Sequence, residues 1–398
     1  MGNVMRGSFK KRLAGAVAAA ALATGAAPAH AAGGNLEPIL RLTAEQRYDD
    51  DALLRNAAGG EGQFITRISP QGGALYKDRG LQFEGWYSPD VLYYETTHHA
   101  SLEHRGSFQL KKKLSEVTRA NVDLKIWRVS DPTSLPRLGI ARSIEPILYG
   151  KADLSMDTRL AERWNGKVGY HFEGVQIYHA GEMPGFVNAP FAETSYRVTR
   201  RSDLGVGYRF QLFTFGAEVA SSNSAYLRYA TRLTRSMTFT ADAGPAWYND
   251  RNHPERTGLL PRANLELARQ GPKLDLGLNV GHDLVGASGF ANAVWADYAG
   301  LVGAYRFLQG VPLKVFAAAS YFRDGQPPSR GVLPLFSSGQ GVSQGYSVGG
   351  GLEWRFNTWL AAQGAFDRFS QLGGQYGVVT ADLTRNVVSA RLNMTAFQ

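Results

Sequence analysis

Cysteine is absent from the 398 residues of the chain. A small core held together by disulfide bridges is therefore excluded, although the chain carries the features of an exported protein described below. Long apolar runs are also missing after the first thirty residues, so no later segment predicts a membrane-spanning helix, which needs about 20 apolar residues. No stretch shows convincing helical periodicity either. These absences leave β-structure as the main expectation.

Neither the distribution of charge nor the composition indicates a boundary between two domains. The formal net charge is +9 at pH 7, and removing the four basic residues of the N-terminal segment leaves +5. This mild excess does not predict a nucleic-acid partner. No Pro/Ser-rich linker, block of like charges or change of composition separates two parts. We therefore expect one large repetitive architecture, even though the chain is long for a single domain.

The N-terminus predicts a cleavable signal peptide. Four basic residues lie between Arg6 and Arg12, and a small-residue apolar stretch runs from Leu13 to Pro28. Ala29-His30-Ala31 then matches the pattern at which signal peptidase cuts, so cleavage is expected after Ala31. The apolar stretch is too short for a helical membrane anchor. The expected division is a signal peptide over residues 1–31 and one β-domain over 32–398.

Alternation of apolar and polar residues is the dominant pattern of the remaining chain. Its segments are mostly about 10 residues or longer, which suits a tilted membrane strand and exceeds the usual length of soluble strands. The clearest runs have apolar positions at Ala120, Val122, Leu124 and Ile126; at Leu204, Val206, Tyr208, Phe210 and Leu212; at Leu274, Leu276, Leu278 and Val280; and at Val388, Ala390, Leu392 and Met394.

The predicted connections alternate in length. Short turns are expected at Lys77–Gly80, Leu114–Thr118, Arg200–Asp203, Arg235–Met237, Gln270–Lys273, Gln309–Pro312 and Asn357–Thr358. Longer polar loops are expected at Asp49–Gly62, Ser130–Arg142, Ala180–Pro190, Asp250–Arg256, Asp324–Gly341 and Gln371–Thr384. This pattern predicts an all-β fold, an antiparallel transmembrane β-barrel of the Gram-negative outer membrane with periplasmic turns and extracellular loops. The count is about 18 strands, with 16 as the alternative.

Charged residues on the parity opposite to the apolar one predict the lining of a lumen. An Arg or Lys facing lipid at mid-depth would cost about 2–4 kcal/mol, whereas a wet lumen tolerates it. The candidates are Arg41, Arg47, Glu103, Arg105, Lys125, Lys151, Asp153, Arg209, Arg228, Arg232, Arg262, Glu353, Arg355 and Arg391. Most are expected to form cross-strand ion pairs, while the sharper hypothesis is a basic stripe of Arg209, Arg228, Arg232 and Arg262 that attracts anionic solutes.

Two of the predicted loops carry apolar side chains that water alone would not favour. Phe186 lies in the expected loop 180–190, and Leu333, Leu335 and Phe336 lie in the expected loop 324–341. These loops either fold inward as a constriction or pack on the barrel rim. The sequence leaves both alternatives open.

Motifs for catalysis or metal binding are weak. Gly341-Val-Ser-Gln-Gly345 matches G-x-S-x-G, but the strand–turn–helix context of a nucleophile elbow is missing around Ser343. His98, His99 and His104 lack further ligands at metal spacing. We therefore expect no catalytic residue, no metal and no cofactor.

Several short segments resemble the putative β-barrel porins of Gram-negative bacteria. The similar segments are Leu36-Glu-Pro-Ile-Leu-Arg-Leu, Tyr48-Asp-Asp-Asp, Phe64-Ile-Thr-Arg-Ile-Ser-Pro, Tyr87-Ser-Pro-Asp-Val-Leu-Tyr-Tyr and Thr384-Arg-Asn-Val-Val-Ser. That family is often found with exopolysaccharide export systems. The resemblance implies an outer-membrane channel through which an exopolysaccharide, or another polar solute, leaves the cell.

The partners expected on this basis are outer-membrane lipid and lipopolysaccharide, a polysaccharide and a periplasmic export protein. A plugged barrel that serves as an adhesin or assembly scaffold is the alternative function, followed by an outer-membrane hydrolase.

Overall fold

The computed structural model describes residues 35–52, 62–131, 146–178, 184–286, 293–307, 312–325, 343–372 and 382–396. The predicted signal peptide lies outside these ranges. Within them the chain forms 18 strands and one short 3-10 turn, η4 (Pro254–Arg256). None of the described helical residues makes a segment long and apolar enough to span a membrane.

The strands are 12 to 17 residues long, as the long alternating segments predicted. They are β1 (Asn35–Asp49), β2 (Gln63–Lys77), β3 (Leu81–Tyr94), β4 (His99–Lys113), β5 (Thr118–Val129), β6 (Ile147–Arg159), β7 (Trp164–Ile177), β8 (Gly185–Arg197), β9 (Ser202–Phe215), β10 (Glu218–Thr234), β11 (Met237–Asp250), β12 (Gly258–Arg269), β13 (Leu274–Gly286), β14 (Ala293–Arg306), β15 (Leu313–Gly325), β16 (Ser343–Arg355), β17 (Leu360–Leu372) and β18 (Leu383–Thr395).

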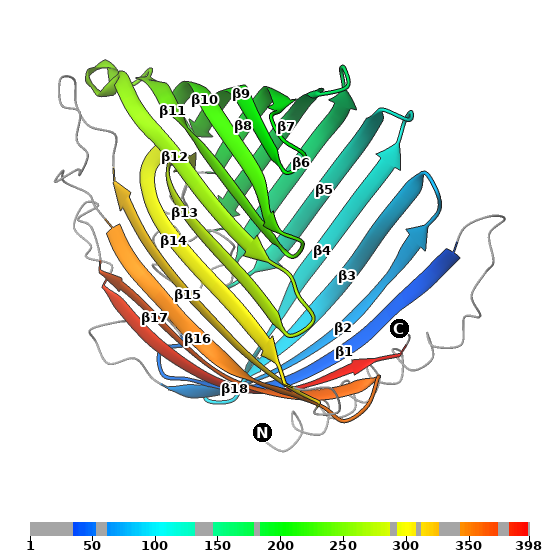
Figure 1. Cartoon of the computed structure of the whole chain (residues 1–398). Coiled ribbons are helices and arrows are strands. Elements are labelled where there is room, and N and C mark those ends of the chain that lie inside the picture. The colour runs from blue at the N-terminus through cyan, green and yellow to red at the C-terminus, as the bar shows by residue number, and fades with distance from the viewer. Residues whose placement is uncertain are drawn as a thin grey trace.

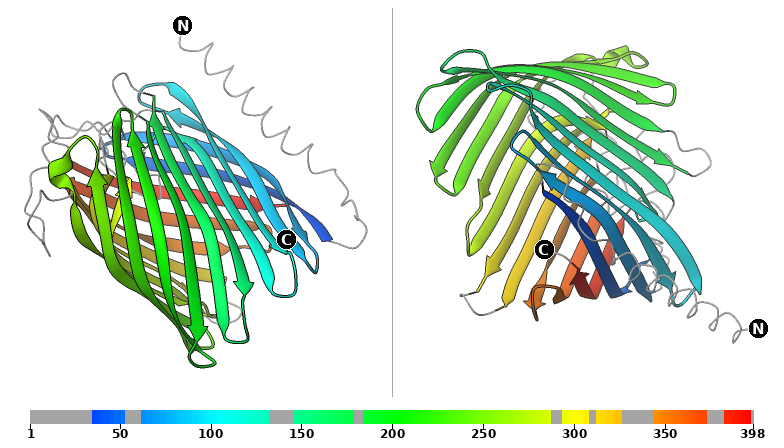
Figure 2. Two further views of the ribbon diagram at one scale, coloured as in Figure 1. Left: turned by 90° about the horizontal axis from the view of Figure 1, so that it is seen from above. Right: turned by 90° about the vertical axis from the view of Figure 1, so that its right-hand side faces the viewer.

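Each strand pairs antiparallel with the next, and the last returns to the first (Figure 1). The β1–β18 ladder runs from Arg41 opposite Thr395 to Asp49 opposite Val387. In Figure 2 the blue β1 accordingly lies beside the red β18. The sheet is therefore a closed barrel with 18 strands, which confirms the larger of the two predicted counts.

The two faces of the sheet follow the alternation of the sequence. In β9 the side chains of Leu204, Val206 and Tyr208 are each about half exposed, while Gly205 and Gln211, on the other parity, are buried. Exposed apolar side chains occupy the same outward parity on most strands. Since strands alternate strictly, the charged residues between them face the interior. The outside of the barrel is thus suited to hydrocarbon and the inside to water and ions.

The two ends of the barrel differ. At the end where β1 begins and β18 finishes, here called the turn end, the connections are short: 78–80, 114–117, 160–163, 198–201, 235–236, 270–273, 307–312 and 356–359. At the opposite end, the loop end, most connections are longer. Two are not, because β3–β4 and β9–β10 are joined by residues 95–98 and 216–217. Gly216 supplies the positive φ of 58° that this two-residue hairpin requires.

The structure corrects one predicted loop. Residues 180–190 were expected to form a connection, but β8 begins at Gly185. The inward residues Val187 and Ala189 are apolar and buried. The usual apolar-out, polar-in alternation is therefore lost here, and so the start of the strand looked like a loop.

Candidate functional site: the lumen and its constriction

All fourteen predicted lumen residues lie in strands, on the inward parity. Their role in lining a conducting pore stays a prediction. Nine of them take part in ion pairs, namely Arg105, Lys151, Asp153, Arg209, Arg228, Arg262, Glu353, Arg355 and Arg391. Glu103 instead accepts a hydrogen bond from the backbone N–H of Ser130 at 2.8 Å. Arg41, Arg47, Lys125 and Arg232 form no ion pair in the part of the chain that the structure describes. The interior is thus a mosaic of both signs.

The predicted basic stripe is therefore largely neutralised. Arg228 lies 3.1 Å from Glu193, and Arg209 and Arg262 share a carboxylate of Asp283. Only Arg232 lacks such a partner among the described residues. A simple anion-attracting stripe does not describe this wall.

One charge network lies within the part of the wall formed by β18, β1, β2, β3 and β4. Asp90 is fully buried, and its Oδ2 accepts hydrogen bonds from Arg67 and Arg105, each at 2.6 Å. Glu45 lies beside this group and pairs with Arg391 at 2.9 Å. Each acid thus has an arginine from a neighbouring or nearby strand. The wall network braces strands that backbone hydrogen bonds already hold together.

The barrel wall is interrupted between β12 and β13 at the loop end. Their ladder ends at Ala263 opposite His282, whereas the β11–β12 ladder continues to Gly258. The β13–β14 ladder also continues, to Gly286 opposite Ala293. Residues 283–286 and 293–296, which we call the tip, therefore leave β12 while staying paired with each other.

Pro261 accounts for the end of the ladder. It stands opposite Pro245 in the β11–β12 register. Neither proline has an N–H, so these two residues form a non-hydrogen-bonded pair between β11 and β12. The backbone nitrogen and carbonyl of Pro261 therefore point toward β13. There it offers no donor to β13. The neighbouring strand is free to separate at this residue.

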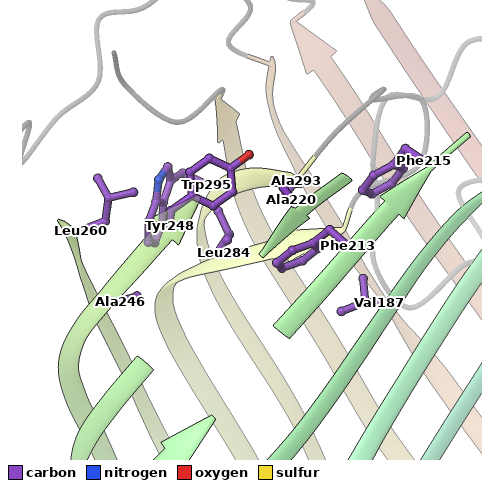
Figure 3. Packing of buried hydrophobic residues seen from close by; sticks show 10 residues of the cluster. All are labelled: Val187, Phe213, Phe215, Ala220, Ala246, Tyr248, Leu260, Leu284, Ala293 and Trp295. Carbon is purple, nitrogen blue, oxygen red and sulfur yellow. The ribbon is translucent and has the colours of Figure 1, made fainter. Parts of the chain in front are cut away.

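The tip bends into the lumen and packs on the inner face of the wall at β8, which lies five strands from β13. A Cβ built on Gly286 would lie 2.6 Å from Cγ2 of Val187 in β8. Leu284 and Trp295 have outward parity in their own strands, yet both are buried. They join an apolar cluster with Tyr248, Phe213 and other wall residues, in which Leu284 lies between these two rings (Figure 3). Burial of a large apolar side chain contributes about 1.5–3 kcal/mol. The tip is thus a constriction in the lumen.

Charged groups anchor the base of the tip. The Oδ2 of Asp283 lies 3.0 Å from Nε of Arg262 in β12 and 3.3 Å from Nη1 of Arg209 in β9. Arg262 is 4% exposed and lies 2.9 Å from Asp242. The ring of Tyr226 covers Arg262, with 4.6 Å between ring centroid and Cζ. We call this group the tip anchor.

A second inward contact is made by Arg385 of β18. Its Nε donates to both carboxylate oxygens of Asp49 at 2.9 and 3.0 Å, and its Nη1 lies 2.8 Å from Asp131, which follows β5. Arg385 and Asp49 are almost completely buried. Asp131, just after β5, is therefore held against β18, several strands away in the barrel.

The predicted constriction residues are not where the sequence placed them, or lie outside the described residues. Phe186 belongs to β8 and not to a loop. Its ring is 37% exposed on the outward parity and stacks on Phe172 at 6.2 Å, so it is not part of a constriction. Leu333, Leu335 and Phe336 lie outside the described residues. The constriction that the described chain does form comes from β13 and β14.

The rejected catalytic and metal motifs gain no support from the geometry. Ser343 is buried at the start of β16, and its hydroxyl has no hydrogen-bond partner among the described residues. His104 points to the outward face, where Tyr87 contacts its ring at 2.6 Å. Across the described ranges, no group of three or more metal-ligating side chains is present.

Sequence reasoning missed Asp90, Arg67, Tyr226 and Arg385. Their inward parity was the available signal. It was obscured because apolar residues such as Ile65, next to Arg67 on the same face, are also inward and buried. Alternation identifies a lumen only where the inward residues are polar. In the loop-end half of this barrel many inward residues are apolar, so the alternation is lost there.

Comparison with known proteins gives a likeness in architecture. No protein-family model matches the chain, and a search of curated proteins gave no significant match. Among solved structures, OpdF (OccK2) from Pseudomonas aeruginosa is 13% identical, with coverage of 90% of this chain and 98% of that chain and a TM-score of 0.46. OpdK from the same organism is 12% identical (91% and 99%, TM-score 0.45), and OccAB4 from Acinetobacter baumannii is 11% identical (90% and 98%, TM-score 0.43). At this level the likeness concerns the barrel fold alone.

Proposed function

We propose that the protein is an outer-membrane channel for polar solutes. The observation that carries the proposal is the closed 18-stranded barrel with exposed apolar side chains outside and charged side chains inside. Strands cross a membrane only when the sheet closes, because an open edge would leave backbone groups unpaired in hydrocarbon. Barrels of 16 to 18 strands are wide enough to leave an aqueous channel.

The tip favours small solutes in the state that the structure shows. Passage of a polysaccharide chain, as the resemblance to exopolysaccharide-associated porins implies, would require the tip to leave the lumen. In that form of the proposal the partners are the polysaccharide, a periplasmic export protein, and the lipid and lipopolysaccharide around the barrel. No catalytic step is assigned to any residue.

Single-channel recording in planar bilayers tests the proposal. We expect discrete conductance steps, and we expect Arg228→Glu combined with Arg232→Glu to shift ion selectivity toward cations. Unchanged ion selectivity would show that these two arginines do not line the conducting pore.

The plugged barrel is the second candidate, and the packed tip favours it. A correctly folded protein that conducts neither as wild type nor after removal of the tip would support a scaffold or adhesin and would contradict the channel.

A further inference from the structure

We propose that Arg209 and Arg262 form a binding site for an organic anion with an apolar body, and that this anion opens the lumen by displacing the tip. In this structure the tip itself occupies the site. The inference rests on the proposed channel function and adds to it the chemistry of a ligand and a mechanism of opening.

The first observation is the carboxylate that the two arginines hold. Asp283 belongs to the tip, while Arg209 and Arg262 belong to the facing wall strands β9 and β12. Two guanidinium groups converging on one carboxylate oxygen are a typical arrangement for recognising an anion. Asp283 therefore stands where the acidic group of a solute would bind.

The second observation is an unused donor. Nη1 of Arg262 is buried and has no hydrogen-bond partner in the part of the chain that the structure describes. A guanidinium has five N–H donors, and a buried donor left unpaired costs about 1–3 kcal/mol. Asp283 thus satisfies this arginine incompletely. A carboxylate free to reorient could take up the remaining donor.

The third observation is the way in which the tip is held. The described backbone of residues 283–286 has no ladder with β12, since the pairing ends at Ala263 opposite His282. It is linked to the wall by the Asp283 contacts, a 3.4 Å hydrogen bond from Gln211 to the carbonyl of Leu284, and apolar packing. Side-chain contacts of this kind can be replaced by a ligand without breaking a β-ladder.

The fourth observation defines the rest of the ligand. Directly beyond Asp283, Leu284 and Trp295 fill the space against Phe213 and Tyr248 (Figure 3). When the tip leaves, an apolar surface becomes free next to the two arginines. A ligand that replaces the tip must therefore carry an acidic group and, beside it, an aromatic or aliphatic body.

Displacement follows from competition for one site. The anion binds only when the tip is out, so its presence shifts the population toward the open lumen. When two binding events are coupled in this way, one ordinarily changes the affinity of the other by a factor of at least about five. We therefore expect a saturating anion to raise the open probability by about that factor or more.

A disulfide lock tests whether the tip moves. Because the chain has no cysteine, the pair Val187→Cys and Gly286→Cys is unique, and the short approach of these residues suits a disulfide. In bilayers we expect the oxidised pair to stay at the lowest conductance and to regain wild-type openings on reduction. The two single variants are the controls. Equal open probability in the oxidised and reduced states would overturn the proposal.

Ligand dependence is tested with 3-phenylpropionate as the probe, its amide as the uncharged control and acetate as the control without an apolar body. Only phenylpropionate should open the wild type, and it should have no effect on the oxidised lock. Asp283→Asn weakens the anchor and should be open without any anion. An equal effect of the amide would overturn the arginine site, and an equal effect of acetate would overturn the apolar half.

The outcomes separate the two proposals. If no variant conducts, including the reduced pair and Asp283→Asn, the channel function itself fails. If all variants conduct alike and phenylpropionate has no effect, the channel function stands and the anion-opened tip fails.

Discussion

Two charged groups of the interior differ in what they hold together. The wall network of Arg67, Asp90 and Arg105 joins strands that backbone ladders also hold, since the β2–β3 ladder skips residues 69–71 but resumes at Gly72. The tip anchor of Arg262 and Asp283 joins segments whose ladder has already ended. The same kind of ion pair therefore has different consequences. In the wall it adds to the backbone hydrogen bonds between strands, whereas at the tip it is a large part of what holds the tip to the wall. Four sets of substitutions test this difference.

Arg262→Met should have the largest effect on stability. It leaves Asp242 buried without its arginine and leaves Asp283 with Arg209 alone, and breaking the buried Arg262–Asp242 pair costs about 3–5 kcal/mol. In Arg67→Met, Asp90 keeps Arg105, and the loss should be about 1.5–3 kcal/mol, the value of one charged hydrogen bond. Urea unfolding with lipid vesicles, followed by tryptophan fluorescence, measures both. Equal losses would contradict the distinction between wall and tip.

Pro261→Val should close the gap in the wall. It restores an N–H on the side that faces β13, so the β12–β13 ladder can continue toward Leu284 and draw the tip out of the lumen. We expect higher conductance and slower amide exchange at residues 284–286. Pro38→Val, in β1 at the turn end, is the matched control and should change neither quantity.

Gly286→Ala should have a smaller effect in the same direction. The added Cβ would lie 2.6 Å from Val187, so the tip must shift away from the wall. The matched control is Gly258→Ala, because a Cβ there meets nothing within 4 Å. A rise in open probability for Gly286→Ala alone is expected, and equal values in both variants would argue against contact between the tip and β8.

Glu116→Gln should have no measurable effect. Glu116 lies in an exposed turn, where Lys113 donates to it at 2.6 Å and lowers the pKa of its carboxyl group. Since this pKa is lowered, any stabilisation is present above the ordinary carboxyl pKa and is lost as the pH falls through the lowered value. Full solvent exposure screens the pair. The unfolding midpoints of variant and wild type should coincide at neutral and acidic pH.

The barrel could be predicted because its cause is local. Leu204, Val206 and Tyr208 alternate with Gly205, Gly207 and Arg209, and a strand converts such alternation into two opposite faces whatever its neighbours are. The number of strands followed from counting these segments. The turn at residues 160–163 was missed because it contains no glycine, proline, asparagine or aspartate. The start of β8 at Gly185 was missed because its inward residues Val187 and Ala189 are apolar.

The candidate site depended on contacts between distant segments. Composition and parity placed Arg209, Arg228 and Arg262 inside the barrel, but not the carboxylates that neutralise them. Asp283 meets Arg209, which is 74 residues away along the chain, because the tip bends into the lumen. The order of residues along the sequence does not show which distant segments come into contact in this way.

Alternation and strand length are properties of single segments, so the amino-acid sequence alone specifies a closed barrel with a charged interior. The narrowing of the lumen by β13 and β14 depends instead on contacts between strands that are distant in the sequence. One proline without an N–H ends a ladder, and where the freed tip then packs depends on the shape and charge of the wall opposite it.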